Sequence, residues 1–206
     1  MSKRTLRSIL GAGQPTSLPA RTTALLVIDF QNEYFTGSLP IPNGTSALHN
    51  ARALVDYADR HGWTVVHVQH VAPAESPLFA ANGRFAEICA DIQPKANHRL
   101  ITKTSVSVFA STDLAQTLKA DGITHLVICG LMTHACVAGA ARDAVPAGFE
   151  VVVAADACAT RDIEFNDTAS VPHEMLHLSA LAEIADTFGS VLNTREVLSL
   201  ASSGTS

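Results

Sequence analysis

Short, continuously apolar segments alternate with longer amphipathic segments along the chain, and this alternation limits the possible folds more than any other feature. The segment ALLVIDF at residues 24–30 is apolar at nearly every position, as is typical of a strand buried on both faces. The segment GTSALHNARALVDYADRHG at residues 44–62 spaces its apolar residues like an amphipathic helix and ends on glycine. Repetition of this pair predicts parallel strands joined by right-handed helical crossovers.

The same pattern, followed to the end of the chain, predicts an α/β fold: a three-layer α-β-α sandwich around a six-stranded, mostly parallel, Rossmann-like sheet. We expect residues 1–20 to form an N-terminal arm, residues 21–200 a single domain, and residues 201–206 a tail. Strands are expected at residues 24–30, 63–70, 98–103, 125–130, 150–157 and 190–194. Helices are expected at residues 44–62, 111–122, 134–148 and 170–189, with a final helical turn at 195–200.

The composition excludes several classes of protein. The 206 residues are 47% hydrophobic and 16% charged, which suits one domain with a sizeable core. The net charge is -5, and the sequence has no cluster of positive residues of the kind that binds nucleic acid or a membrane surface. We therefore expect neither partner. No apolar run approaches the ~20 residues of a membrane span, and the N-terminus is too weakly apolar for a secretory signal. Four cysteines without metal-binding spacing indicate free thiols, so we expect a cytoplasmic protein.

Chemically reactive side chains follow the predicted strands at one edge of the sheet. In an open parallel sheet, ligands bind beyond the carboxyl ends of the strands. Asp29 ends the first strand, Gln69 and His70 end the second, and Lys103 ends the third. The segment Gly130–Cys136 follows the fourth strand and leads into a predicted helix. An acid, an amine and a thiol are therefore expected to converge at this edge.

Together these three groups suit nucleophilic catalysis. A thiol at a helix start lies in the positive end of the helix dipole, which lowers its pKa, and a nearby ammonium acts in the same direction. Asp29 could accept the thiol proton and return it to a leaving amine. Taken singly, each residue has an ordinary interpretation: Asp29 as a turn residue, Lys103 as a solvated surface residue, and Cys136 as a small core residue.

Three ordered segments carry a resemblance to a known family: LLVIDFQNEYF at 25–35, KTSVSVF at 103–109, and VICGLMTHACVAGAARDAVPAGFEVVVAADACAT at 127–160. On these segments the chain resembles the isochorismatase-like cysteine hydrolases, which include nicotinamidases and N-carbamoylsarcosine amidases, over residues 22–200. The resemblance implies a catalytic triad of Asp29, Lys103 and Cys136. It also implies a cis peptide bond between Leu131 and Met132, and an oxyanion hole formed by the backbone N–H groups of Met132 and Cys136.

The resemblance further implies a reaction and the molecules that take part in it. We expect hydrolysis of an amide, urea-like or lactam C–N bond of a small molecule through a thioester-type covalent intermediate. The nicotinamidase branch holds a metal with an Asp-x-His pair, which the segment QNEYFTGSLPIPNG after Asp29 lacks. We therefore expect neither a metal nor another cofactor. The resemblance and the apolar helices both suggest a homo-oligomer, either a dimer or a tetramer.

Five residues are candidates for the substrate pocket because they lie near the predicted strand ends or in the loops that follow them. Each of them could equally be a packing residue of the core. The candidates are Phe35, Gln69, His70, Phe109 and Leu131.

Two rival functions remain open. The segment HEMLH could place His173 and His177 one helical turn apart as zinc ligands, with Glu174 as the general base and Glu196 as a third ligand. The ordinary interpretation is that these histidines are packing or surface residues of a helix. The other rival is a non-catalytic interaction module on the same fold, because a fold alone does not determine function.

Overall fold

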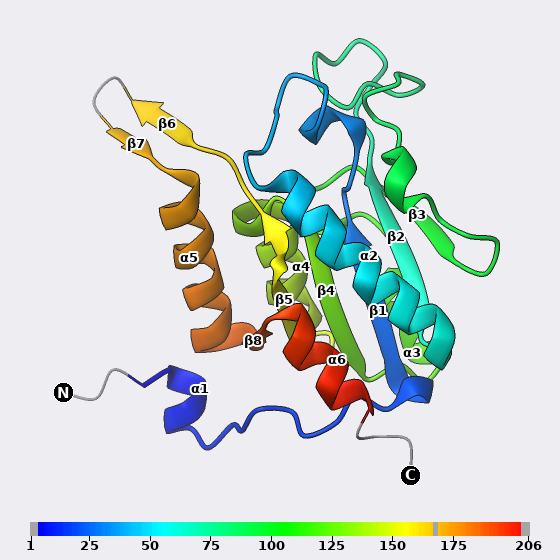
Figure 1. Ribbon diagram of the computed structural model, residues 1–206, viewed down its shortest axis with the longest axis vertical. Coiled ribbons are helices and arrows are strands. Elements are labelled where there is room, and N and C mark those ends of the chain that lie inside the picture. The colour runs from blue at the N-terminus through cyan, green and yellow to red at the C-terminus, as the bar shows by residue number, and fades with distance from the viewer. Residues whose placement is uncertain (1–3, 167–168, 203–206) are drawn as a thin grey trace.

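The computed structural model describes residues 4–166 and 169–202, and its centre is one sheet of six strands. All of the pairings in this sheet are parallel, in the order β3-β2-β1-β4-β5-β8. Helices cover both faces of the sheet (Figure 1), so the predicted three-layer α/β architecture is confirmed. The strands are β1 Thr23–Ile28, β2 Thr64–His70, β3 Arg99–Lys103, β4 His125–Leu131, β5 Glu150–Ala159 and β8 Ser190–Leu192.

The helices divide the apolar core into two layers. Helices α2 (Gly44–His61) and α6 (Thr194–Ser202) pack on one face of the sheet. Helices α3 (Leu114–Ala120), α4 (Ala138–Ala144) and α5 (His173–Glu183) belong to the layer on the other face. Each strand of the centre is therefore shielded from water on both sides, as its continuous apolar sequence predicts.

Helix α2 shows how the sequence pattern becomes structure. Ala47, Ala51, Leu54 and Ala58 recur at intervals of three and four residues and are all buried. Gly62 ends the helix in the left-handed conformation, with φ 73°, and its N–H donates to the carbonyl of Ala58. The helix therefore runs close to the predicted length.

Several elements differ from the prediction. The helix expected at 134–148 starts as a π-helical turn, Thr133–Val137, and continues as α4. The long helix expected from residue 170 begins only at His173, because a hairpin of β6 (Ile163–Asn166) and β7 (Ala169–Val171) precedes it. The N-terminal segment contains a short helix, α1 (Leu6–Ile9), which contacts the helical turn that directly follows α5. None of the helices within the described residues is long and apolar enough to cross a membrane.

The site lies where the sheet changes direction. Chain connections leave β1 and β4 toward opposite edges of the sheet, which creates a crevice at their carboxyl ends. The two strands approach closely there: a Cβ on Gly130 would lie 2.3 Å from the carbonyl oxygen of Ile28. Gly130 also has φ 149°, a backbone conformation that other residues rarely adopt. Glycine is therefore required at residue 130 both by the close approach of the strands and by the backbone conformation.

Candidate active site

Asp29 is the first residue after β1 and is fully buried. Its backbone lies in the left-handed region, with φ 54°, which short polar side chains tolerate better than most. Its N–H donates to the carbonyl of Val68 at 2.9 Å, and its own carbonyl accepts from the N–H of Gln31 at 2.8 Å. These two backbone hydrogen bonds fix Asp29 at the edge of the sheet where the strands have their carboxyl ends.

Lys103 is the last residue of β3, and its side chain is also fully buried. Its Nζ lies 2.8 Å from Asp29 Oδ2 and 3.4 Å from Cys136 Sγ. The same ammonium lies 3.2 Å from the carbonyl oxygen of Ser105 and 3.2 Å from His70 Nδ1. One cation therefore touches both the carboxylate and the thiol, and the structure brings Asp29, Lys103 and Cys136 together.

Cys136 sits in the π-helical turn with 7% of its surface exposed. The pKa of its thiol is raised to about 12, first by burial and then by the negative charge of Asp29, against the opposing effect of Lys103. The sequence-based expectation of a lowered pKa thus differs from the structure, because desolvation outweighs the ammonium. Burial also raises the pKa of Asp29, although contacts with Lys103 and Cys136 oppose the rise. These shifts favour a neutral thiol and make the carboxylate of Asp29 more basic than that of an ordinary aspartate.

The turn that carries Cys136 begins beside a cis peptide bond between Leu131 and Met132. The carbonyl of Met132 accepts the N–H of Ala135 at 3.1 Å and that of Val137 at 3.3 Å. These bonds therefore do not use the N–H groups of Met132 and Cys136, which are the two expected to form the oxyanion hole.

Three of the five predicted pocket residues lie around this site or in the loop after Asp29. His70 is half-buried, contacts Lys103 through Nδ1, and meets the ring of Phe79 edge-on at 5.2 Å. Leu131 is fully buried at the end of β4, two residues before the π-helical turn that carries Cys136. Phe35 is half-buried in the loop after Asp29 and packs against one core layer.

Gln69 and Phe109 are not brought to the triad. Neighbouring residues of a strand point to opposite faces, so Gln69 faces away from His70 and donates to the carbonyl of Ala86 at 2.8 Å. Phe109 stacks on Phe149, with ring centroids 6.1 Å apart, in the layer formed by α3 and α4. Phe149 immediately precedes β5, so this contact lies toward the amino end of that strand.

Two residues near the site were missed in the sequence analysis. Tyr34 is buried, and its pKa is raised by burial and by the nearby Cys136 and Asp29. Arg161 follows β5 and lies close enough to Tyr34 and His134 to affect their pKa values. Its Nε is buried without a hydrogen-bond partner among the described residues. The strand-end rule would have found Arg161 if the fifth strand had been extended to its true end at Ala159.

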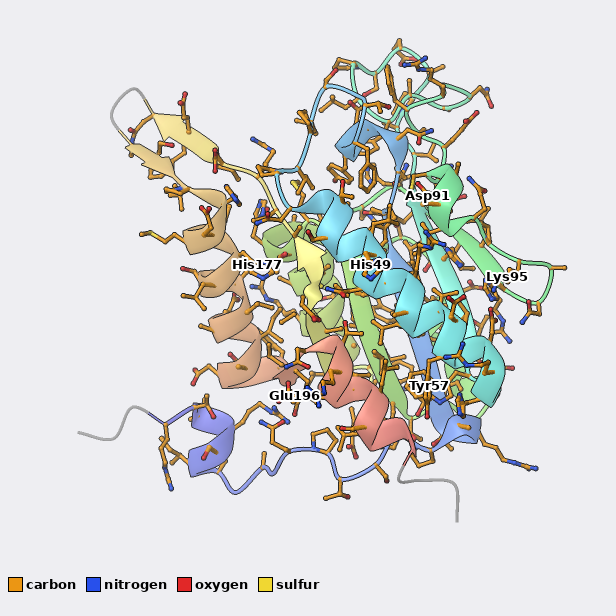
Figure 2. All side chains as sticks on the ribbon, viewed as in Figure 1. His49, Tyr57, Asp91, Lys95, His177 and Glu196 are labelled. Atoms are coloured by element: carbon orange, nitrogen blue, oxygen red, sulfur yellow. The ribbon has the colours of Figure 1, made fainter. Side chains whose placement is uncertain are left out.

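The HEMLH segment forms the start of α5 without gathering metal ligands. His173 Nδ1 lies 2.8 Å from Asp162 Oδ1, whereas His177 Nδ1 lies 2.8 Å from Thr133 Oγ1. Glu196 lies on α6, which packs in the core layer on the other face of the sheet from the layer that contains α5, so it cannot join them. Figure 2 shows Glu196 well apart from His177. Within residues 4–166 and 169–202, no three or more His, Cys, Asp or Glu side chains are grouped to hold a metal ion.

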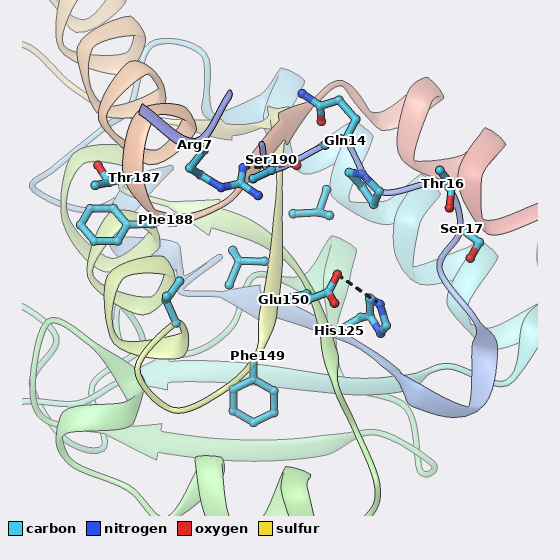
Figure 3. Close-up of a pocket in the computed structure, with 16 residues that line it drawn as sticks. Arg7, Gln14, Thr16, Ser17, His125, Phe149, Glu150, Thr187, Phe188 and Ser190 are labelled. Carbon is cyan, nitrogen blue, oxygen red and sulfur yellow. Dashed lines mark hydrogen bonds and ion pairs between the residues drawn. The ribbon is translucent and has the colours of Figure 1, made fainter. Parts of the chain in front are cut away.

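A cavity of about 520 Å³, whose lining residues Figure 3 shows, lies at the amino ends of the strands, at the opposite edge of the sheet from Asp29 and Cys136. Its walls are the N-terminal segment and the amino ends of β4, β5 and β8. Its polar groups include Arg7, His125, Glu150 and Ser190. Because it lies away from Cys136, it is separate from the candidate active site.

Comparison with known proteins adds independent information. Residues 23–196 match the model of the isochorismatase domain. The chain is 36% identical over 191 residues to the secreted isochorismatase effector Isc1 of Verticillium dahliae, covering 93% of this chain and 97% of that protein. It is 28% identical over 196 residues to maleamate amidohydrolase of Pseudomonas putida, covering 86% of each chain. A solved isochorismatase structure from Pseudomonas putida superposes with a TM-score of 0.88 at 28% identity, covering 95% of this chain and all of that one (100%).

Proposed function

The chain belongs to the isochorismatase family, and from that premise we propose that it is a cysteine-dependent hydrolase that cleaves an amide-type C–N bond of a small molecule. The observation that carries the proposal is the position of the Lys103 ammonium. It lies 2.8 Å from a carboxylate oxygen of Asp29 and 3.4 Å from the sulfur of Cys136; Asp29 and Lys103 are fully buried, and 7% of the surface of Cys136 is exposed. Base and nucleophile thus share one cation.

The first half-reaction forms a thioester. As Cys136 Sγ attacks the substrate carbonyl carbon, the thiol proton passes to Asp29. The carbonyl oxygen becomes an oxyanion, which the backbone N–H groups of Met132 and Cys136 would stabilise. The tetrahedral intermediate then collapses, the C–N bond breaks, and Asp29 returns the proton to the leaving amine.

The second half-reaction consumes water. Asp29 takes a proton from a water molecule whose oxygen attacks the thioester carbonyl, and the C–S bond breaks when this intermediate collapses. The acid product leaves, and Cys136 recovers a proton from Asp29. Lys103 stabilises whichever partner carries the negative charge, and the raised thiol pKa does not prevent attack because the proton passes to Asp29 as the sulfur attacks.

Arg161 favours a substrate that carries an anionic group. A guanidinium offers five donors, and within the described residues that of Arg161 makes one hydrogen bond, from Nη1 to the neighbouring carbonyl of Asp162 at 3.0 Å. A carboxylate could accept two parallel hydrogen bonds from the remaining donors. The relative named maleamate amidohydrolase, whose named substrate is an organic anion, agrees with this direction.

A screen of small amides, ureas and lactams, each with and without a carboxylate, tests the proposal. We expect hydrolysis by the unaltered protein and none by Cys136→Ser. Cys89→Ser is the matched control, because Cys89 is also buried but does not belong to the triad. Arg161→Gln should raise KM mainly for the substrates with a carboxylate. Activity that survives in Cys136→Ser would assign the reaction to another site.

We also propose that the protein is a homo-oligomer located in the cytoplasm. Phe165, Met175 and Leu178, on the hairpin and α5, are each more than half exposed, which favours a further covering surface. The molar mass in solution, measured by light scattering, tests the oligomer; a monomer would contradict it.

A further inference from the structure

The nucleophile turn, Thr133–Val137, is held from two sides by other elements. Thr133 is fully buried, and its Oγ1 lies 2.8 Å from Nδ1 of His177 on α5. His134 Nδ1 lies 2.6 Å from Oγ1 of Thr160, just after β5. The first two residues of the turn are thus tied to different elements, Thr133 to helix α5 and His134 to the residue that follows β5.

His177 can hold Thr133 in only a limited set of geometries. The pKa of His177 is lowered by burial and by the neighbouring His173, so at neutral pH its ring is uncharged and one of its nitrogens is an acceptor. The Thr133 hydroxyl can then donate to Nδ1, or accept from it in the other tautomer. Without His177, the hydroxyl of Thr133 would be buried with no partner from α5, which is costly.

The contact lies close to the reacting atoms along the chain. Thr133 follows the cis bond at Met132 and precedes Cys136 by three residues. A shift of this turn would change the 3.4 Å separation between Cys136 Sγ and Lys103 Nζ. Catalysis is sensitive to displacements of this kind, because a misplacement of ~1 Å can cost about a hundredfold in rate.

We propose that His177 is a positioning residue of the nucleophile turn, which acts through Thr133 to set the place of Cys136. The inference rests on the proposed function, since it assumes that Cys136 is the nucleophile. In this proposal the second histidine of HEMLH supports the thiol of Cys136 and does not bind a metal. His177 faces the nucleophile turn, and Figure 2 shows it between α5 and α4.

The test compares variants of His177 on an amide found in the screen. His177→Ala should lower kcat about tenfold with little change in KM, because the chemical step and not substrate binding is disturbed. His177→Asn should recover most of the lost kcat, because its amide can meet the hydroxyl of Thr133. His173→Asn is the matched control, since His173 lies one helical turn earlier and contacts Asp162 and Glu174 instead of the turn.

A double-mutant cycle with Thr133→Val separates positioning from general stability. If the two side chains act through their mutual bond, the double variant His177→Ala/Thr133→Val should lose no more kcat than the worse single variant. Thermal unfolding of every variant provides the second readout. A lowered midpoint with unchanged kcat, additive losses in the cycle, or no recovery in His177→Asn would each overturn the inference.

The failure of this inference is distinguishable from failure of the proposed function. If Cys136→Ser still hydrolyses the amide, the proposed function is wrong. If Cys136→Ser is inactive while His177→Ala keeps its full kcat, the function stands and only the positioning role is wrong.

Discussion

The ion pair of Asp29 and Lys103 makes a prediction that joins stability to catalysis. Both side chains are fully buried, and the carboxylate oxygen Oδ2 lies 2.8 Å from the ammonium. Replacing Lys103 by Met keeps much of the side-chain volume and removes the charge. At pH 7 the remaining carboxylate would then be buried without a counter-ion, so Lys103→Met should lower the free energy of unfolding by about 3–5 kcal/mol.

The loss should depend on pH in a defined direction. The pKa of Asp29 is already raised by burial, and removal of Lys103 removes the main influence that opposes the rise. A group whose pKa is higher in the folded than in the unfolded protein stabilises the fold below its unfolded pKa, and this contribution is lost as the pH rises through the folded pKa. The deficit of Lys103→Met should therefore shrink as the pH falls from 7 toward 4.

Urea unfolding at several pH values measures these quantities. The double variant Asp29→Asn/Lys103→Met lacks the titrating carboxylate of this pair, so its stability relative to the unaltered protein should not recover on acidification in the same way. It should also be more stable at pH 7 than the sum of the two single losses implies. A Lys103→Met protein whose deficit is below about 1 kcal/mol, or is independent of pH, would refute the buried ion pair.

Three further predictions concern other parts of the molecule. The pKa of His67 is lowered from 6.5 to about 4 by burial and by His98, so its contribution to stability is complete above pH 6.5 and is lost as the pH falls toward 4. The stability lost in this way is about 3 kcal/mol, so His67→Gln should weaken the fall of the free energy of unfolding between pH 6.5 and 4. An unchanged fall would contradict this prediction. Gly130→Ala would place a Cβ 2.3 Å from a backbone oxygen and should lower the free energy of unfolding by about 3 kcal/mol or more. In the control Gly139→Ala the nearest atom would be 3.4 Å away, so its stability should not fall in this way. Equal midpoints of thermal unfolding for the two variants would refute the close approach. EDTA should leave amide hydrolysis unchanged, because the described residues group no three metal-binding side chains; a loss that zinc restores would revive the HEMLH interpretation.

The sheet was predictable because its central strands are apolar on both faces and short polar segments end them. Asp29 could be placed because it follows the apolar run of β1, and Lys103 because it is the last residue of the short edge strand β3. All strands of a parallel sheet end at one edge, so the two residues were expected there. The order of the strands, with β1 beside β4, then brings the two residues and Cys136 together.

The remaining features depend on tertiary contacts that no local pattern records. The hairpin of β6 and β7 is largely exposed, and its strands have only four and three residues, so the alternation of apolar and polar residues in them is too short to indicate a strand. Arg161 was missed because β5 runs two residues beyond its expected end at residue 157. The direction of the Cys136 pKa shift follows from 7% exposure and a nearby carboxylate, whereas the sequence suggested only the helix start and a lysine.

The covalent intermediate offers the most direct measurement of the central claim. Turnover of an amide identified in the screen would be quenched in acid within milliseconds, and the peptide that contains Cys136 would be weighed by mass spectrometry. We expect an added acyl mass on Cys136 alone, which disappears with hydroxylamine and never forms in Asp29→Asn. An acyl adduct on a different residue, or steady turnover by protein whose Cys136 has been fully alkylated, would contradict it.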